Sequence, residues 1–340
     1  MSRALDPQRI LCVAPNWVGD SLFFLPAVDA LKRRFAGAEL DLLARASIAA
    51  LLKDGGRFDR AYSLPAGTGR WHRFQALWKL RQRRYDLAVV FPDSFSTALA
   101  ARLSGAGVRV GRVGEGRAPL LSRGYRLPRR DRSRHVVDEY LDLALACGAE
   151  ADASQRMPRL APPSTGMEER QRLFREHGLG AGLLVGLCPT SAFGPSKQWP
   201  ARHWVELARR LRELRYSVVF FCAPLELDAV APMAREAGGA AVLAPSLPGL
   251  AACLQACEMV VANDSGPLHM AAAVGARCLG LYGPIDPRWS APQSPRAQAL
   301  YLGLSCSPCF AKVCPLKHHD CLETLGVDQV LDAFQQLLKR

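Results

Sequence analysis

The stretch Met259–Pro284, MVVANDSGPLHMAAAVGARCLGLYGP, constrains the fold of this chain more than any other. Its first four residues form an apolar run short enough to be a buried strand, and a polar turn follows. Leu268–Val274 consists almost entirely of small residues, which predicts a helix that packs close to a sheet. Arg277–Tyr282 is then the next strand, and Gly283-Pro284 ends it. A strand, a turn, a helix and a second strand form a βαβ unit, which implies a parallel sheet.

The polar turn of this unit has residues suited to binding phosphate. Gly266 lets a ligand approach the backbone closely, and the unpaired N–H groups and dipole of a helix N-terminus attract phosphate. Ser265 adds a hydroxyl, and His269 lies one turn further along at the same end. A purely structural interpretation fits equally well, because Asp264 and Ser265 are helix-capping residue types and His269 suits a packed helix. The residues alone leave both interpretations open.

NDSGPLH, followed by LYGP, resembles the nucleotide-sugar site of glycosyltransferase family 9, the ADP-heptose–lipopolysaccharide heptosyltransferases. The family more often has another apolar residue where Pro267 stands. The resemblance implies that four residues of the turn and helix bind the ADP-sugar substrate: Asp264, Ser265, Gly266 and His269.

Strand and helix patterns alternate in both halves of the 340-residue chain, which predicts an α/β fold with two doubly wound parallel sheets. Glu150–Gly166 is rich in proline and is the expected linker. We expect an N-terminal acceptor-binding domain over residues 1–155, an ADP-sugar-binding domain over 166–326 and a closing helix over 327–340. The resemblance implies that the two Rossmann-like domains face each other in the GT-B arrangement.

Asp20 follows the first predicted strand, Arg9–Ala14, within the motif PNWVGD. Gly19 permits a tight turn there, and ligand sites of α/β proteins form at the carboxyl ends of strands. A carboxylate in this position can accept a proton from an attacking sugar hydroxyl, although an Asp at a helix start is often only a cap. PNWVGD resembles the heptosyltransferase motif, more that of the second heptosyltransferase than of the first. The resemblance implies that Asp20 is the catalytic base.

Two further residues are candidates for binding the nucleotide. Lys197 lies in CPTSAFGPSKQWP, between a strand and a helix, where one lysine can place a charge on a diphosphate. An ordinary exposed lysine is the alternative, but FGPSKQWP again resembles the second heptosyltransferase. Thr190-Ser191 differ from the Gly-Ala-Glu usual in the family. Glu226 follows a strand in CAPLE and can bind ribose hydroxyls, or it can simply stand at a helix N-terminus.

A cysteine-rich segment, CSPCFAKVCPLKHHDC, lies near the C-terminus. On spacing alone its four cysteines allow a zinc site: Cys306, Cys309, Cys314 and Cys321. A reduced cluster that stabilises a loop is the alternative. The same segment occurs in many second heptosyltransferases, whose transfer chemistry is considered independent of metal. We therefore expect no catalytic metal and no cofactor, and any metal here would be structural.

The net charge of +13 is concentrated in the first half of the chain. Residues 1–150 carry 25 Lys/Arg against 15 Asp/Glu, and Arg102–Arg134 alone holds ten arginines and two acids. Such a run indicates a solvated surface, an anionic membrane or phosphorylated lipid, or nucleic acid. Aromatic residues are not interleaved with these arginines, which disfavours nucleic acid. Five arginines are the expected acceptor contacts: Arg123, Arg126, Arg129, Arg130 and Arg132.

The first residues lack the long apolar run of a signal peptide, and no stretch of about eighteen uncharged apolar residues exists. We therefore expect a cytoplasmic protein that contacts the inner membrane peripherally. The resemblance implies an inverting transferase that moves heptose from ADP-heptose to the inner-core heptose of a phosphorylated lipid A-core acceptor. Two alternatives stay open, namely a GT-B nucleotide-sugar epimerase or hydrolase and a zinc-containing nucleic-acid-binding protein.

Overall fold

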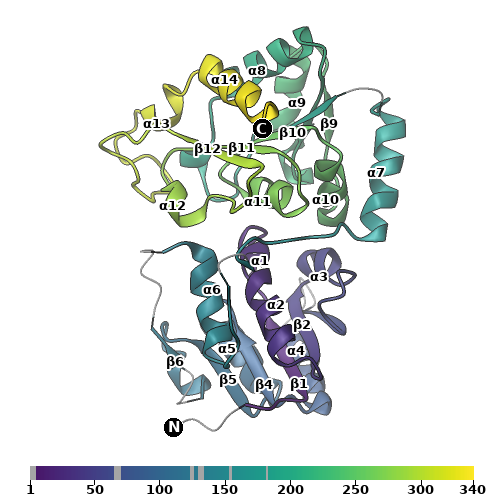
Figure 1. Cartoon of the computed structure of the whole chain (residues 1–340), viewed down its shortest axis with the longest axis vertical. Coiled ribbons are helices and arrows are strands. Elements are labelled where there is room, and N and C mark those ends of the chain that lie inside the picture. The colour runs from purple at the N-terminus through teal and green to yellow at the C-terminus, as the bar shows by residue number, and fades with distance from the viewer. Residues whose placement is uncertain (1–4, 65–69, 123–125, 129–133, 153–154, 181–182) are drawn as a thin grey trace. The chain divides into compact units, whose positions relative to one another are not determined.

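The computed structural model describes residues 5–64, 70–122, 126–128, 134–152, 155–180 and 183–340. The chain divides into two compact units, Met1–Pro158 and Arg159–Arg340. Each unit contains one six-stranded parallel sheet with helices around it (Figure 1). The α/β fold predicted from the alternating pattern is therefore confirmed.

The sheet of the first unit has the strand order β3-β2-β1-β4-β5-β6. Its strands are β1 (Arg9–Val13), β2 (Glu39–Arg45), β3 (Arg60–Leu64), β4 (Leu87–Val90), β5 (Val108–Arg112) and β6 (Arg126–Leu127). Its helices are α1 (Asp20–Phe23), α2 (Leu25–Arg34), α3 (Ala46–Leu52), α4 (Arg70–Lys79), α5 (Phe95–Leu103) and α6 (Val136–Leu145), and its 3₁₀ turns include η1 (Leu80–Arg83) and η2 (Ala118–Leu120).

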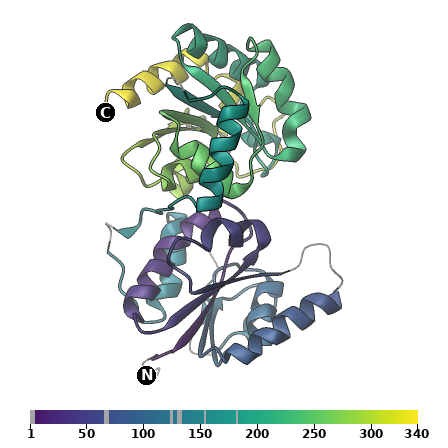
Figure 2. The same cartoon turned by 90° about the vertical axis from the view of Figure 1, so that its right-hand side faces the viewer.

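The two central strands, β1 and β4, are almost wholly buried, as the apolar runs ILCV and LAVV predict for a sheet covered on both faces. Figure 2 shows α2 and α6 on one side of the sheet and α4 and α5 on the other. The strand order changes direction between β1 and β4, so their carboxyl ends form the switch point where ligands bind in such folds.

The sheet of the second unit has the order β12-β11-β10-β7-β8-β9. Its strands are β7 (Leu184–Cys188), β8 (Ser217–Phe221), β9 (Ala241–Leu243), β10 (Met259–Asn263), β11 (Cys278–Tyr282) and β12 (Ala297–Tyr301). Its helices are α7 (Ser164–Glu176), α8 (Ala201–Glu213), α9 (Leu227–Glu236), α10 (Leu247–Gln255), α11 (Gly266–Ala273), α12 (Pro287–Ser290), α13 (Asp320–Glu323) and α14 (Val327–Leu338), and its 3₁₀ turns include η5 (Pro195–Lys197) and η6 (Pro224–Glu226).

The βαβ unit predicted from the sequence is present as β10, α11 and β11, and β10 pairs in parallel with both β11 and β7. Strand order reverses between β7 and β10, which makes their carboxyl ends the switch point of this unit. The closing helix α14 packs into the core of the same unit through residues such as Val330 and Phe334. It is therefore part of the second sheet's packing.

The expected linker is shorter than its composition suggested, because α7 begins at Ser164 and includes Gly166. Pro163 stands just before the helix, where its missing N–H costs nothing. A β-carbon on Gly166 would lie 2.2 Å from the carbonyl oxygen of Pro248. This glycine thus allows α7 to pack closely against α10 rather than providing flexibility.

The arginine-rich stretch is partly structural, so the expectation of a solvated or ligand-facing surface is wrong for two of its members. Arg117 is fully buried and donates to the carbonyl oxygens of Arg112 and Ser94. Arg112 is buried as well and donates to Asp142 at 2.8 Å. Of the five expected acceptor contacts, Arg126 is exposed; the others lie outside the described residues: Arg123, Arg129, Arg130 and Arg132.

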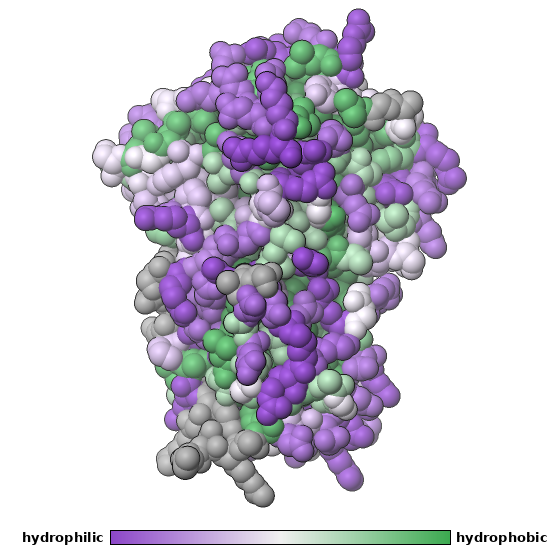
Figure 3. Space-filling view, viewed as in Figure 1, coloured by the Kyte–Doolittle hydropathy of each residue, from purple (hydrophilic) through white to green (hydrophobic). Residues whose placement is uncertain are grey.

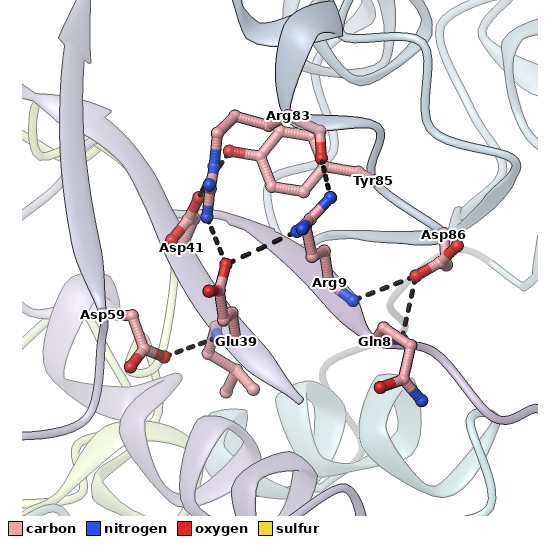
Figure 4. A network of polar contacts seen from close by, with 9 residues as sticks. Gln8, Arg9, Glu39, Asp41, Asp59, Arg83, Tyr85 and Asp86 are labelled. Carbon is pink, nitrogen blue, oxygen red and sulfur yellow. Dashed lines mark hydrogen bonds and ion pairs between the residues drawn. The ribbon is translucent and has the colours of Figure 1, made fainter. Parts of the chain in front are cut away.

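A polar network lies at the amino ends of β1, β2 and β4 (Figure 4). Asp41 is fully buried, and its Oδ2 accepts from the Tyr85 hydroxyl at 2.7 Å and from Arg83 Nε at 3.2 Å. Arg83 also pairs with Glu39, and its carbonyl oxygen accepts from Arg9. The network therefore fastens η1, and with it the end of α4, to the edge of the sheet.

The surface shown in Figure 3 is mostly hydrophilic, and its hydrophobic residues lie in small areas between polar ones. None of the helices formed by the described residues is long and apolar enough to cross a membrane.

Candidate active site

Asp20 lies at the switch point of the first unit, as predicted, and begins α1 directly after the loop that follows β1. Its Oδ1 accepts a hydrogen bond of 2.7 Å from the hydroxyl of Tyr140, which belongs to α6. Gly19 occupies the N-cap position instead, so Asp20 is not the helix cap that the structural interpretation assumed. The carboxylate is half-buried and held in place by a neutral donor, an arrangement compatible with accepting a proton.

The second unit brings Lys197 and Asp264 together at its own switch point. Lys197 ends η5 in the loop after β7, and Asp264 follows β10. The Nζ of Lys197 lies 2.5 Å from Asp264 Oδ2, and the two side chains are only 11% and 4% exposed. Lys197 also lies over the ring of Phe193, 4.6 Å from its centroid. It is therefore not the ordinary exposed lysine that the sequence left open as an alternative.

His269 joins this pair from α11, since its Nε2 lies 3.5 Å from Asp264 Oδ1. Burial opposes ionisation of Asp264, but the hydrogen bond from His269 and the charge of Lys197 outweigh it and hold the pKa of this carboxyl below its ordinary value. One buried carboxylate thus orients two nitrogen-bearing side chains at the start of a helix. This arrangement suits the binding of an anion beside Lys197.

Ser265 is the N-cap residue of α11, but its side chain makes no capping hydrogen bond. Its Oγ is buried and has no hydrogen-bond partner among the residues that the structure describes. Gly266 is the first helical residue, whose N–H has no partner within a helix, and Pro267 contributes no N–H. The capping interpretation of the Ser265 side chain is therefore wrong, and the start of α11 is of the kind that can accept an anion.

Asn263 has a role that its residue type did not reveal. Its Nδ2 donates to Pro189 O at 2.6 Å, and its Oδ1 accepts from Trp199 N at 3.0 Å. These two contacts hold both ends of the loop that carries Lys197. Asn263 therefore positions Lys197 relative to β10. No signal in the sequence could have assigned these partners, which lie 74 and 64 residues away.

Glu226 ends η6 after β8, at the carboxyl edge of the sheet beside the Lys197 loop. Its Oε2 accepts from Thr190 Oγ1 and from Ala223 N, both at 2.8 Å. Thr190, set aside on sequence grounds, thus links the two loops. Ser191 follows it with a buried hydroxyl that has no partner in the described part of the chain. The sequence feature that could have identified Thr190 and Ser191 as site residues was their position just after the strand β7.

The cysteine-rich segment contacts the loop that carries Lys197. Ser196 donates through its N to Lys312 O at 3.2 Å and through its Oγ to Ala311 O at 2.6 Å. The Nε2 of His319 contacts Ser196 O at 2.7 Å. A β-carbon on Gly194 would lie 2.5 Å from Lys312 O, so only glycine permits this contact. The segment therefore helps to position Lys197.

The four cysteines of this segment are free thiols. Burial, and then the neighbouring Cys306, Cys309 and Cys314, raise the pKa of Cys321 to about 11, which keeps it a neutral thiol near pH 7. Across the described ranges, no group of three or more His, Cys, Asp or Glu side chains is arranged to hold a metal ion.

The fold has counterparts among solved structures. The structure of Escherichia coli ADP-heptose lps heptosyltransferase II superposes with a TM-score of 0.81 at 28% identity, over 97% of this chain and 98% of that one. A glycosyl transferase family 9 protein from Veillonella parvula gives a TM-score of 0.85 at 23% identity, covering 99% of this chain and 98% of the other. The protein is thus a two-domain α/β glycosyltransferase of the GT-B class.

The sequence comparisons narrow this class to one family. The family model described as glycosyltransferase family 9 (heptosyltransferase) matches residues 73–319. Lipopolysaccharide heptosyltransferase 2 of E. coli K12 is 30% identical over 316 residues, which span 87% of this chain and 88% of that protein. Its Salmonella typhimurium counterpart is 31% identical over the same shares. The chain belongs to glycosyltransferase family 9, and the resemblance seen in its motifs is confirmed.

Proposed function

We propose that the protein transfers heptose from ADP-L-glycero-D-manno-heptose to the inner-core heptose of lipopolysaccharide, with inversion at the anomeric carbon. The relatives named as heptosyltransferase 2 support this choice of donor and acceptor class. The observation that carries it is the buried cluster of Lys197 and Asp264 at the N-terminus of α11, which provides a cation and helix N–H groups for a diphosphate.

In the proposed reaction, Asp20 removes the proton of the acceptor hydroxyl while that oxygen attacks the anomeric carbon. The bond from this carbon to the diphosphate oxygen breaks, and ADP leaves with the electron pair. A single displacement of this kind inverts the configuration. Tyr140 orients the carboxylate of Asp20 through its hydroxyl. General-base catalysis of this type contributes about 10² to 10⁴ in rate.

The second unit stabilises the leaving group. Lys197 and the start of α11, with Ser265 and Gly266, neutralise the charge that develops on ADP. Asp264 is itself an anion, so we assign it to orienting Lys197 and His269 and to accepting from a sugar hydroxyl. The remaining acceptor capacity of Glu226 suits a ribose hydroxyl.

The lipid acceptor implies where the protein works. We propose a cytoplasmic enzyme that meets a phosphorylated lipid A-core acceptor at the inner membrane, in keeping with the excess of Lys/Arg in residues 1–150. Heptose transfer also distinguishes this proposal from the alternatives, because an epimerase or hydrolase consumes donor without acceptor.

The test is incubation of the protein with ADP-heptose and a truncated core lipid that ends in one heptose, followed by mass measurement of the lipid. We expect a mass gain of one heptose and equimolar ADP, only when both substrates are present. Release of ADP at the same rate without acceptor would indicate a hydrolase, and no change in either substrate would contradict the proposal.

A further inference from the structure

The helix α4 carries a stripe of aromatic side chains along its outer face. Trp71 and Trp78 are 66% and 50% exposed, unusually high fractions for tryptophan. The ring of Phe74 stacks between them, with centroids 5.6 Å from each. The guanidinium of Arg81 lies 4.3 Å from the Trp78 ring and extends the row into η1. Positions 71, 74 and 78 fall on one face of a helix. We call these three residues the α4 aromatic stripe.

The other side of this helix explains why the stripe is held rigidly. Leu77 and Leu80 are buried in the core of the first unit, and α4 packs against α5 and β3. The network of Figure 4 then fixes η1 through Arg83. In Figure 2, α4 is the blue helix at the lower right edge of this unit. The stripe is therefore presented outward by an anchored helix and is not needed for the core.

The charge around the stripe indicates what it meets. Residues 71–84 contain five Lys/Arg and no Asp or Glu. Arg83 is engaged in the network with Asp41 and Glu39, but Lys79 and Arg84 are exposed. Tryptophan beside basic residues on one helix face is typical of segments that lie in the interface of an anionic bilayer. A cationic, aromatic surface also complements such a bilayer electrostatically.

We propose that the α4 aromatic stripe, with Lys79 and Arg84, docks the first unit onto an anionic lipid bilayer. The idea rests on the proposed function in one respect, since an acceptor held in a bilayer gives the docking a purpose. It adds to any contribution of the arginine-rich stretch, two of whose members, Arg112 and Arg117, are buried inside the fold. The tryptophans insert at the level of the headgroups, and the cations bind lipid phosphates.

The first experiment is cosedimentation of the full chain with vesicles of phosphatidylcholine alone or mixed with phosphatidylglycerol. Trp71→Ser combined with Trp78→Ser should weaken partitioning onto the anionic vesicles by about tenfold or more. The matched control is Leu214→Ser, which removes a side chain 51% exposed in the second unit and should change binding less than about twofold. Lys79→Gln with Arg84→Gln should weaken binding to anionic vesicles alone, and less so in high salt.

A second measurement guards against a folding defect in the double tryptophan variant. Brominated lipids should quench the fluorescence of the wild-type protein and quench the variant much less, at equal melting temperatures. Equal partitioning or equal quenching of the two proteins would overturn the proposal. The proposal would also fail if the wild-type protein did not bind vesicles and the double tryptophan variant bound a single-stranded oligonucleotide more weakly than the wild type. Stacked aromatic side chains also bind bases, so this result would indicate a nucleic-acid surface.

Turnover separates this proposal from the proposed function. The double tryptophan variant should keep wild-type kcat and KM with a deacylated, soluble acceptor and show a raised KM for the same acceptor embedded in vesicles. Wild-type protein that binds vesicles through the stripe but transfers no heptose would refute the function alone. Wild-type transfer with an unchanged KM of the variant on vesicles would refute the docking alone.

Discussion

The carboxyl ends of the two sheets differ, although their strand orders are equivalent. In the second unit, buried polar side chains crowd this edge: Lys197, Asn263, Asp264 and His269. In the first unit, the corresponding edge carries the half-buried carboxylate of Asp20 with its Tyr140 partner, and a further polar network lies at the amino ends of the strands. A buried cation at a helix N-terminus suits a ligand of constant charge, such as a diphosphate, whereas a half-buried carboxylate keeps its capacity to accept a proton.

The largest effect should come from the carboxyl edge of the first unit. Asp20→Asn should lower turnover by about 10² to 10⁴, the usual contribution of a general base, and leave the affinity for ADP unchanged. Steady-state kinetics and calorimetry with ADP measure the two quantities. Asp29→Asn is the control, because it removes a carboxylate of the same unit that lies on α2 and pairs with Arg57. Near wild-type turnover of Asp20→Asn would remove this residue from the mechanism.

At the carboxyl edge of the second unit, a substitution should affect ADP binding first. Lys197→Ala should weaken ADP binding by roughly 10- to 150-fold and adenosine binding much less, since hydrogen bonds to charged groups contribute about 1.5–3 kcal/mol. Lys312→Ala is the matched control: its side chain is exposed, and only its carbonyl oxygen contacts the same loop. Calorimetry that finds equal losses for ADP and adenosine would contradict a diphosphate role for Lys197.

The network at the amino end of the first sheet should affect stability alone. Arg83→Met leaves the buried carboxylate of Asp41 with the Tyr85 hydroxyl and without a cation, which should cost about 2 kcal/mol of unfolding free energy. Turnover per folded molecule should stay unchanged. Denaturant titration measures the first quantity, and the neighbouring exposed Arg84→Met is the control. A loss of turnover in Arg83→Met would break the distinction between the two ends of this sheet.

Sequence predicted the location of the site better than its internal contacts. Lys197 and Asp264 follow neighbouring strands of one sheet, and parallel strands bring their carboxyl ends to one edge, so the place of this pair was accessible. Asp20 likewise follows a predicted strand of the other sheet. The hydrogen-bond partner of Asp20 could not be predicted, because Tyr140 lies 120 residues away on α6. The role of Asn263 was not accessible either, since nothing local in the sequence shows that its amide spans a loop.

The arginine-rich stretch was misjudged for a related reason. An arginine is normally exposed, and a run of ten predicts a surface. Arg117 is nevertheless buried because backbone carbonyl oxygens surround its guanidinium. Those carbonyl oxygens belong to segments apart in the sequence, so only the folded chain brings them together.

Asn263 offers a test, with a smaller expected effect, of how the Lys197 loop is held in place. Asn263→Ala leaves Pro189 O and Trp199 N without their buried partner, which should cost about 1–2 kcal/mol of unfolding free energy. Because the Lys197 loop loses its anchor, ADP affinity should also fall a fewfold, while adenosine affinity holds. Gln255→Ala, at the exposed end of α10, serves as the control. Lower stability with unchanged ADP affinity would show that the clamp does not position Lys197.

The pH dependence of stability gives the smallest expected effect. The pKa of Asp264 is lowered from its ordinary value of 3.8, so the carboxylate stabilises the fold at pH values above about 4. This stabilisation is lost as pH falls below 3.8 through the folded-state pKa. The difference in unfolding free energy between wild type and Asp264→Asn should therefore be constant from pH 7 to 5 and shrink below pH 4.

Salt separates this buried ion pair from one whose cation is exposed. The hydrogen bond from Arg288 lowers the pKa of Asp286 as well, but Arg288 is 91% exposed in its side chain. Added salt should reduce the effect of Asp286→Asn and leave that of Asp264→Asn nearly unchanged, because ions screen exposed pairs far more than buried ones. Denaturant midpoints at pH 6 and 3.5, each at low and high salt, measure the salt dependence of the two effects. Equal salt sensitivity of the two variants would mean that Asp264 is solvated, and the contrast between a buried ionic cluster at one edge and a half-buried carboxylate at the other would then fail.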